Sequence, residues 1–313
     1  MGLFRRDPMP KIDPSFGDQR YLWLQSMALA GNWPAVAGFL ASLADPRDVS
    51  FYLCAITKID GSERWLGGVV QQDQSPMALC VYGARLVNWA WEAVSASYGP
   101  GGASQQDRTA FKERLRMAEQ VLGDSVGKDP DNVAAWAEFM RCSRGLNLGT
   151  DETMRRFGEA VARCPDHMRA HDMALQELCE KWHGSHEQMF SFARQATGRA
   201  GPGSQLPDLL VQAHLEYWEY LEEEGQGYFR QPAVIQELLH AANMSIWHPN
   251  YQPRPDWPQA HNNLALAFSL ARQQSYASRL FKQIGDKVTE DPWGNVSGDD
   301  AVTNFRYFRD KMR

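Results

Sequence analysis

The stretch PDNVAAW (Pro130–Trp136) returns twice in altered form, as PDHMRAH (Pro165–His171) and as PDWPQAH (Pro255–His261). Each copy, here called the frame, has Pro-Asp, three variable residues, Ala, and then Trp or His. An Ala-His pair ending at His214 lies between the second and third copies, so the Ala-Trp and Ala-His pairs are 35, 43 and 47 residues apart. Typical residue frequencies predict about 0.1 such frames by chance in a chain of this length. Periods of this size indicate stacked helical hairpins, each too small to bury its apolar face alone.

Composition agrees with a helical, non-membrane protein. The 313 residues allow two compact domains or one extended solenoid, and the repeats favour the solenoid. No stretch approaches the roughly 18 apolar residues of a membrane span. The first eight residues contain charge but no apolar region follows them, so no secretory signal is predicted and a cytoplasmic location is expected. Apolar residues recur every three or four positions and alternating runs are few, which predicts an all-α fold.

The net charge bears on the class of partner, and the cysteine content bears on whether disulfides are expected. The net charge of −6 argues against a nucleic acid held through its phosphates. The acidic run at residues 222–224 is interpreted as a solvated helix end. Five cysteines, odd in number and without a Cys-x-x-Cys pair, are expected to be reduced and to pack as small hydrophobes. They are Cys54, Cys80, Cys142, Cys164 and Cys179.

Periodicity together with start and stop signals places the helices. The glycine-rich stretch at residues 99–102 is the best candidate for a boundary, although a turn between two helices is favoured over an interdomain linker. It would separate an N-terminal helical region, residues 1–100, continuous with the solenoid, from helical repeats at residues 103–313. The predicted helices are 20–30, 33–43, 46–59, 63–72, 76–97, 107–122, 132–144, 151–163, 166–181, 185–198, 206–223, 231–243, 257–272, 275–288 and 299–313.

The last unit resembles a tetratricopeptide repeat, with His261 in place of the early Trp and Phe268 at the second aromatic position. More specifically, residues 163–194, with segments near 75–91, 213–216, 261–262 and 292–293, resemble a mostly actinobacterial family of tetratricopeptide-like proteins of unknown function, over about three quarters of the chain. The resemblance implies a right-handed superhelix of about six to seven hairpins with a C-terminal capping helix. It also implies that the first helix of each hairpin lines a concave, peptide-binding groove.

The concave positions of that repeat class, transferred to this chain, form a polar groove that is basic at one end and acidic further along. Arginine and asparagine suit such a groove because guanidinium and amide groups hold carboxylates and peptide backbone. A merely solvated face is the alternative. The implied groove residues are Arg141, Arg144, Arg169, Asp172, Gln176, Glu216, Glu219, Gln259, Asn262 and Asn263.

Two irregular segments are further candidates for contact with a partner. The loop at residues 245–258 is rich in proline and contains Trp247, Tyr251 and Trp257, which either bind a partner or pack over the last two hairpins. The segment at residues 181–185 is predicted to be a helix stop followed by a new helix start. Its alternative is a recognition corner in which Lys181 and Trp182 contact a ligand.

The histidines invite a metal interpretation, because His167 and His171 are one helical turn apart. However, His171, His214 and His261 occupy the repeat position that Trp136 fills in a sister unit. These rings are therefore predicted to pack, with a ring nitrogen bonded to the neighbouring hairpin. No His-Glu-x-x-His or Gly-x-Ser-x-Gly motif occurs, so no metal site, cofactor or catalytic residue is predicted.

The leading hypothesis is a cytoplasmic scaffold, without enzymatic activity, that binds a protein or peptide in the groove. The runner-up is an enzyme, or a protein that binds a small molecule or metal, with a His/Glu pocket closed by the 245–258 loop. In a third hypothesis the groove is occupied by the chain's own residues 1–100. The identity of the partner and the oligomeric state do not follow from the sequence.

Overall fold

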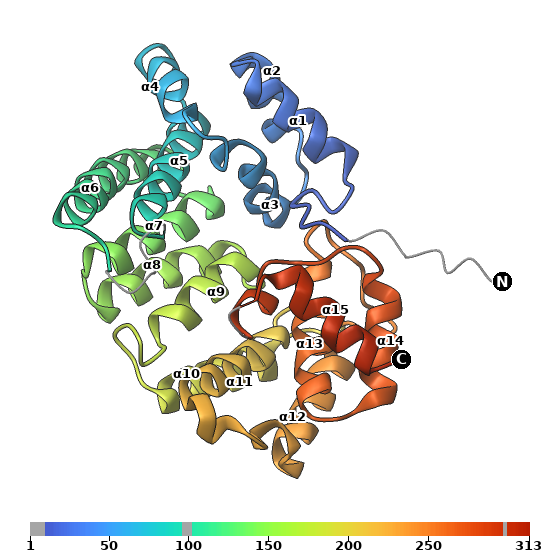
Figure 1. The fold of residues 1–313 in the computed structure, drawn as a ribbon. Helices are drawn as coiled ribbons and strands as arrows, with labels where there is room; N and C mark the ends of the chain where they lie inside the picture. Colours follow the sequence, from blue (N-terminus) through green and yellow to red (C-terminus); the bar gives the residue numbers. More distant parts are fainter. Residues whose placement is uncertain (1–9, 96–101, 297–298) are drawn as a thin grey trace. The chain divides into compact units, whose positions relative to one another are not determined.

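The computed structural model describes residues 10–95, 102–296 and 299–313 (Figure 1). Within these ranges it contains fifteen α-helices and three short 3-10 helices, and no strand. The predicted all-α class is therefore confirmed. Across the same residues, no helix combines the length and apolar character needed to cross a membrane. The glycine-rich stretch that was a candidate boundary lies outside the described residues, apart from Gly102.

The chain divides into two compact units, and the division falls inside one helix. The N-terminal unit comprises Gly17–Met189, and the C-terminal unit comprises Phe190–Arg313 together with the described residues before Gly17. Helix α10 (His186–Arg199) contains the point of division.

In the N-terminal unit, consecutive helices pack on one another from α4 to α9, and α1 packs on α2. The odd-numbered helices α3, α5, α7 and α9 also pack against each other, which places one helix of each hairpin in a shared layer. The helices are α1 (Gln19–Leu29), α2 (Trp33–Ala41), α3 (Pro46–Thr57), α4 (Ser62–Gln72), α5 (Pro76–Ser95), α6 (Gln105–Lys128), α7 (Val133–Leu146), α8 (Thr150–Arg163) and α9 (Met168–Glu177).

In the C-terminal unit, α11 packs on α12 and α13, α13 on α14, and α14 on α15. Trp293 and Phe305 lie fully buried in its core, with ring centroids 5.3 Å apart in an edge-to-face arrangement. Its elements are α11 (Asp208–Leu221), η1 (Glu222–Gly225), η2 (Tyr228–Arg230), α12 (Pro232–Met244), α13 (Pro258–Leu270), α14 (Gln274–Ile284), η3 (Trp293–Asn295) and α15 (Ala301–Lys311).

Most predicted helix ends agree with the structure to within a few residues, and three do not. Helix α6 continues past Leu122 to Lys128, whereas α9 ends at Glu177 instead of residue 181. The chain leaves α9 early because Gly184 folds back against the backbone of Leu178, where a side chain would collide with the carbonyl group. The helix predicted at residues 275–288 ends four residues early, at Ile284, where Gly285 follows with φ 61°. The helix predicted at residues 206–223 ends at Leu221, just before the irregular backbone of Glu222.

The frames determine where three helices begin. Asn132 accepts a hydrogen bond from the backbone N–H of Ala135 at 3.1 Å, and the His167 ring accepts one from Ala170 at 3.2 Å. Both residues are N-caps, which satisfy a backbone donor that the helix itself leaves without a partner. In the third frame the N-cap position is Trp257, and a proline occupies the first turn after it. The third residue of each frame is thus the N-cap.

The last residue of each frame buries its ring and places a ring nitrogen against a backbone carbonyl of the same frame. Trp136 donates from Nε1 to the carbonyl of Pro130 at 2.8 Å, while His171 Nδ1 lies 3.0 Å from the carbonyl of His167. His261 repeats the second arrangement, with Nδ1 3.0 Å from the carbonyl of Trp257. The predicted burial of these rings is confirmed. At His171 and His261 the Nδ1 atom lies against the N-cap carbonyl of the same helix, whereas the prediction was a bond to the neighbouring hairpin.

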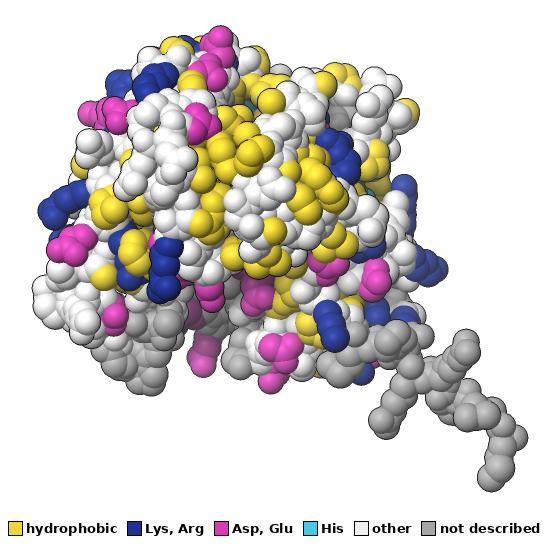
Figure 2. All heavy atoms as spheres, turned by 90° about the horizontal axis from the view of Figure 1, so that it is seen from above, with side chains coloured by type: hydrophobic (Ala, Val, Ile, Leu, Met, Phe, Trp, Pro, Cys, Tyr) yellow, Lys and Arg dark blue, Asp and Glu magenta, His cyan; other side chains and the backbone are white. Residues whose placement is uncertain are grey.

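Charged and hydrophobic side chains are interspersed over the face drawn in Figure 2. The large apolar residues that remain exposed include Leu22, Trp23 and Leu29 of α1.

Replacing His171 by alanine should lower the free energy of unfolding by about 2–3 kcal/mol, because it removes a buried ring, its edge contact with Phe157 and its bond to the helix start. Denaturant unfolding measures the change. His240→Ala, at an exposed position of α12, is the matched control and should change stability by less than about 0.5 kcal/mol. Equal effects of the two substitutions would show that the frame ring does not stabilise the fold.

Candidate functional site

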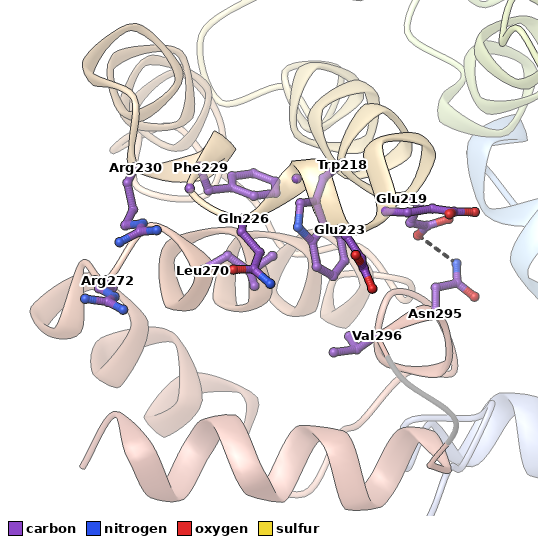
Figure 3. Close-up of a pocket in the computed structure, with 13 residues that line it drawn as sticks. Trp218, Glu219, Glu223, Gln226, Phe229, Arg230, Leu270, Arg272, Asn295 and Val296 are labelled. Carbon is purple, nitrogen blue, oxygen red and sulfur yellow. Dashed lines mark hydrogen bonds between the residues drawn. The ribbon is translucent and has the colours of Figure 1, made fainter.

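A pocket of about 840 Å³ opens in the C-terminal unit among α11, η1, η2, α13 and η3 (Figure 3). Ligand pockets in proteins typically measure about 300–1,000 Å³. Its apolar lining includes Trp218 from α11, Phe229 from η2 and Leu270 from α13. The rings of Trp218 and Phe229 lie 6.2 Å apart, which gives the pocket an aromatic wall.

The irregular backbone after α11 creates the pocket. Glu222 ends the helix with φ 46° and ψ −122°, a conformation that glycine adopts far more readily than other residues. At Gly225 a side chain would lie 3.0 Å from Cδ1 of Trp218, so glycine lets the backbone pass close to the indole. Gly227, with φ 101°, then returns the chain towards α12.

The pocket divides its charges between two ends. Figure 3 shows Arg230 and Arg272 at one end, and Glu219 and Glu223 at the other. Asn295 donates to Glu219 Oε1 at 3.0 Å. By contrast, no hydrogen bond or ion pair within the described residues involves the side chains of Arg230 and Arg272. Both guanidinium groups are exposed and available to an anion.

A second polar cluster lies in the N-terminal unit, on α7 and α9. Glu138 accepts from Arg141 at 3.1 Å and from Arg169 at 3.2 Å, although its own side chain is only 10% exposed. Burial alone would raise the pKa of Glu138, but Arg169 and Arg141 together lower it below its usual value. The structure thus brings two predicted groove arginines together and joins them through one carboxylate.

The third predicted groove arginine, Arg144, has no such partner. Its guanidinium carbon lies 5.7 Å from the ring centre of Trp91 and 5.2 Å from that of Trp182. Its Nε and Nη1 atoms are buried without a hydrogen-bond acceptor among the residues that the structure describes. Burial, and then repulsion from Arg141 and Arg169, lower the pKa of Arg144 to about 10.

The corner after α9 brings Trp182 to this arginine. Trp182 packs edge-to-face on Trp91 at 5.7 Å, and the neighbouring His183 bonds through Nδ1 to buried Glu177 at 2.7 Å. Lys181 is exposed at the same corner. The helix ends before this segment, at Glu177, so the predicted helix stop lies too late, whereas the predicted new helix begins at His186. The corner between the two helices places an indole against Arg144.

The remaining groove positions differ in accessibility. Asp172 and Gln176 of α9, and Glu216 and Glu219 of α11, are half-buried. Glu219 is the predicted groove residue that lines the pocket of Figure 3.

The three amide residues of α13 bond within the C-terminal unit rather than facing an open groove. Asn262 is fully buried, donates to the carbonyls of Pro258 and Lys287, and accepts from Trp293 Nε1 at 2.7 Å. Asn263 donates to buried Asp208 at 2.9 Å. Gln259 is half-buried and donates to Asn263 and to the carbonyl of Asp291. In this structure these side chains stabilise the unit, because their polar atoms bond to it.

The aromatic residues of the 245–258 loop pack on α13 and α14. Trp247 stacks on Phe268 with the ring planes 5° apart and centroids at 5.6 Å. Trp257 contacts His261 edge-to-face at 4.8 Å, and Tyr251 lies 6.2 Å from the same ring. All three loop residues are half-buried, which matches the packing alternative more closely than an open aromatic surface.

His214 bonds to two neighbours, Tyr228 at 2.6 Å and Glu237 at 2.8 Å. Burial lowers the pKa of His214, so the neutral ring is favoured. Among the described residues, no group of three or more His, Cys, Asp or Glu side chains is arranged to hold a metal ion. All five cysteines are free, and burial raises the pKa of Cys80 to about 12 and of Cys164 to about 11, which disfavours the reactive thiolate.

Sequence analysis did not identify Trp218, Phe229, Arg230 and Arg272 as site residues. The signal available was the irregular, glycine-containing segment that follows the acidic run at residues 222–224. That run was interpreted as a solvated helix end, and in the structure Glu222 and Glu223 line the pocket.

No model of a protein family matches the chain, and no curated protein sequence matches it significantly. The resemblance to tetratricopeptide-like proteins stays a prediction from the residues.

Replacing Glu222 by glycine should raise the free energy of unfolding by about 1 kcal/mol, because it relieves a strained backbone conformation. Denaturant unfolding measures the change. Glu223→Gly, one residue further in η1, is the matched control and should lower stability by about 0.5–1 kcal/mol. A loss of stability in both variants would show that Glu222 is not strained.

Asp208 should make stability fall as the pH rises from about 4 to about 6. Burial raises its pKa from 3.8 to about 6, so between these values the folded state holds a proton that the unfolded state has released. Asp208→Asn should remove this fall and raise stability at pH 7 by about 1–3 kcal/mol. Unfolding of both proteins across pH 4 to 7 tests the assignment, which fails if their stabilities differ by a constant amount.

Proposed function

We propose that the chain is a non-catalytic binding protein whose C-terminal unit holds a short segment of a partner protein in the pocket of Figure 3. The observation behind this proposal is that the apolar lining separates two charged ends of the pocket. Arg230 and Arg272 lie at one end, and Glu219 and Glu223 lie at the other.

The ligand must match three features at once. The free guanidinium groups of Arg230 and Arg272 suit a carboxylate, which arginine binds through paired N–H donors. Trp218, Phe229 and Leu270 suit an apolar side chain. The carboxylates of Glu222 and Glu223 suit a basic side chain. A peptide containing an acidic, an apolar and a basic residue provides all three.

The wider proposal is a tetratricopeptide-like solenoid that works in the cytoplasm, as the resemblance of its repeats implies. Support comes from the shared layer of odd-numbered helices in the N-terminal unit and from the frame rings, which occupy the same place at the start of α7, α9 and α13. Under this proposal Arg141, Arg144 and Arg169 form a second binding surface, within the N-terminal unit.

The runner-up, an enzyme or small-molecule site built on a His/Glu pair, has less support. His214 and Glu237 bond to each other, and the second nitrogen of His214 lies 2.6 Å from the hydroxyl of Tyr228. The aromatic residues of the 245–258 loop contact α13 and α14 instead of closing over this pair. A buried, mutually bonded histidine fits a packing role.

Selection from a random heptapeptide library tests the proposed pocket. Peptides that bind the full chain should contain an acidic and a basic residue with apolar residues between them. The double variant Arg230→Glu, Arg272→Glu should bind the selected peptides at least tenfold more weakly, because each lost charge-assisted contact contributes about 1.5–3 kcal/mol. Arg199→Glu, at an exposed position of α10, is the matched control and should bind as the native chain does.

Two results would overturn the proposal. One is a selection that yields no peptide with the expected charges. The other is binding that the pocket double variant retains in full.

A further inference from the structure

We infer that Arg144, enclosed by Trp91 and Trp182, forms a binding site for an oxyanion, either a carboxylate or a phosphate group, in the N-terminal unit. This site does not depend on the pocket of the C-terminal unit, and it names a ligand class for one arginine of the groove proposed in the N-terminal unit.

The first argument is the missing partner of a buried cation. Arg144 is half-buried as a whole, but its Nε and Nη1 atoms are buried, and neither has an acceptor among the described residues. Folded proteins almost always provide a buried charge with a counter-ion or a ligand. The two arginines that are buried most completely, Arg85 and Arg156, follow that rule. Arg85 bonds to Glu63 and Glu92, and Arg156 bonds to Glu119 and Glu152.

The second argument is the charge around Arg144. Arg141 and Arg169 share the carboxylate of Glu138, and Asp172 attracts Arg169 over a longer distance. Glu177 attracts Arg144 over a longer distance, but its Oε1 atom is engaged with His183. At Arg144 the repulsion from Arg141 and from Arg169 is larger than the attraction of Glu177, which favours an anion beside this residue.

The third argument is that the surrounding residues hold the guanidinium in place. Gly145 lets α7 approach α6 so closely that a side chain there would collide with Leu115 and contact Phe111. Trp91 packs edge-to-face on Phe111 at 5.0 Å and on Trp182 at 5.7 Å. Cation–π contact with both indoles keeps the arginine oriented without consuming its N–H donors.

The donor groups that lack an acceptor also indicate which chemical groups the ligand must contain. The Arg144 donors are joined by the Nε1–H of Trp91, which is likewise buried without an acceptor in the described structure. The fork of Arg144 and the N–H of the neighbouring indole are best matched by a group with two or more acceptor oxygens. Carboxylates and phosphates both meet this requirement, and arginine binds either through its planar fork.

Titration of the full chain with two small probes tests the site. The probes are acetyl-glutamate-amide, which has one carboxylate, and inorganic phosphate, each added at constant ionic strength. Indole N–H signals in a proton–nitrogen NMR spectrum report binding, and Trp182→Phe and Trp91→Phe assign the two relevant signals. At least one probe should shift the Trp91 signal in a saturable manner.

Arg144→Met keeps the apolar stem and removes the charge, so it should weaken binding at least tenfold. Its thermal midpoint should not fall, because an unpaired buried charge has been removed. Arg144→Lys keeps the charge without the fork and should weaken binding severalfold, which gives a second test if the first variant folds poorly. Arg116→Met, at an exposed position of α6, is the matched control and should bind normally.

The two probes distinguish the source of the oxyanion. Saturation by acetyl-glutamate-amide alone supports an acidic side chain as ligand, and saturation by phosphate alone supports a phosphorylated one. The inference is overturned if neither probe gives saturable shifts, or if folded Arg144→Met and Arg144→Lys bind as well as the native chain.

Discussion

The bond between a buried ring and the carbonyl at a helix start is the interaction on which the repeated helices depend. At Trp136, His171 and His261 the ring is buried, and one ring nitrogen lies within hydrogen-bonding distance of a backbone carbonyl in the same frame. Two different side chains perform this role, because both combine a flat apolar body with one polar nitrogen. Burial lowers the pKa of both histidines, so the neutral ring is favoured and no charge is placed in the core.

The candidate binding features lie where this regular packing is interrupted. Helix α11 ends at a strained Glu222, and the short 3-10 helices that follow leave a pocket beside Trp218. Helix α9 ends early, and the corner that replaces its last turn places Trp182 on Arg144. Backbone strain in one unit and an unpaired buried charge in the other both cost stability, and proteins commonly accept such costs at binding sites.

Much of the fold could be predicted because helix periodicity and capping act over a few residues. The N-caps Asn132 and His167 and the proline after Trp257 all lie within the frames. The site was harder to predict. Arg141, Arg144 and Arg169 were identified from the repeat register, but their distribution between Glu138 and the two indoles depends on how α5, α7 and α9 pack. Asn262 was placed in the groove by the same register, whereas its amide bonds to Trp293, which lies 31 residues further along the chain.

The sequence by itself determined the all-helical class, most helix boundaries and the burial of the frame rings, because each follows from local spacing and hydrogen bonding. Only the tertiary structure decided which polar residues have partners. Arg85 and Arg156 meet carboxylates from other helices, while Arg144 meets two tryptophans and no carboxylate. The pairing of a buried charge depends on side chains that are distant in sequence, and no local pattern specifies which of them will lie within hydrogen-bonding distance.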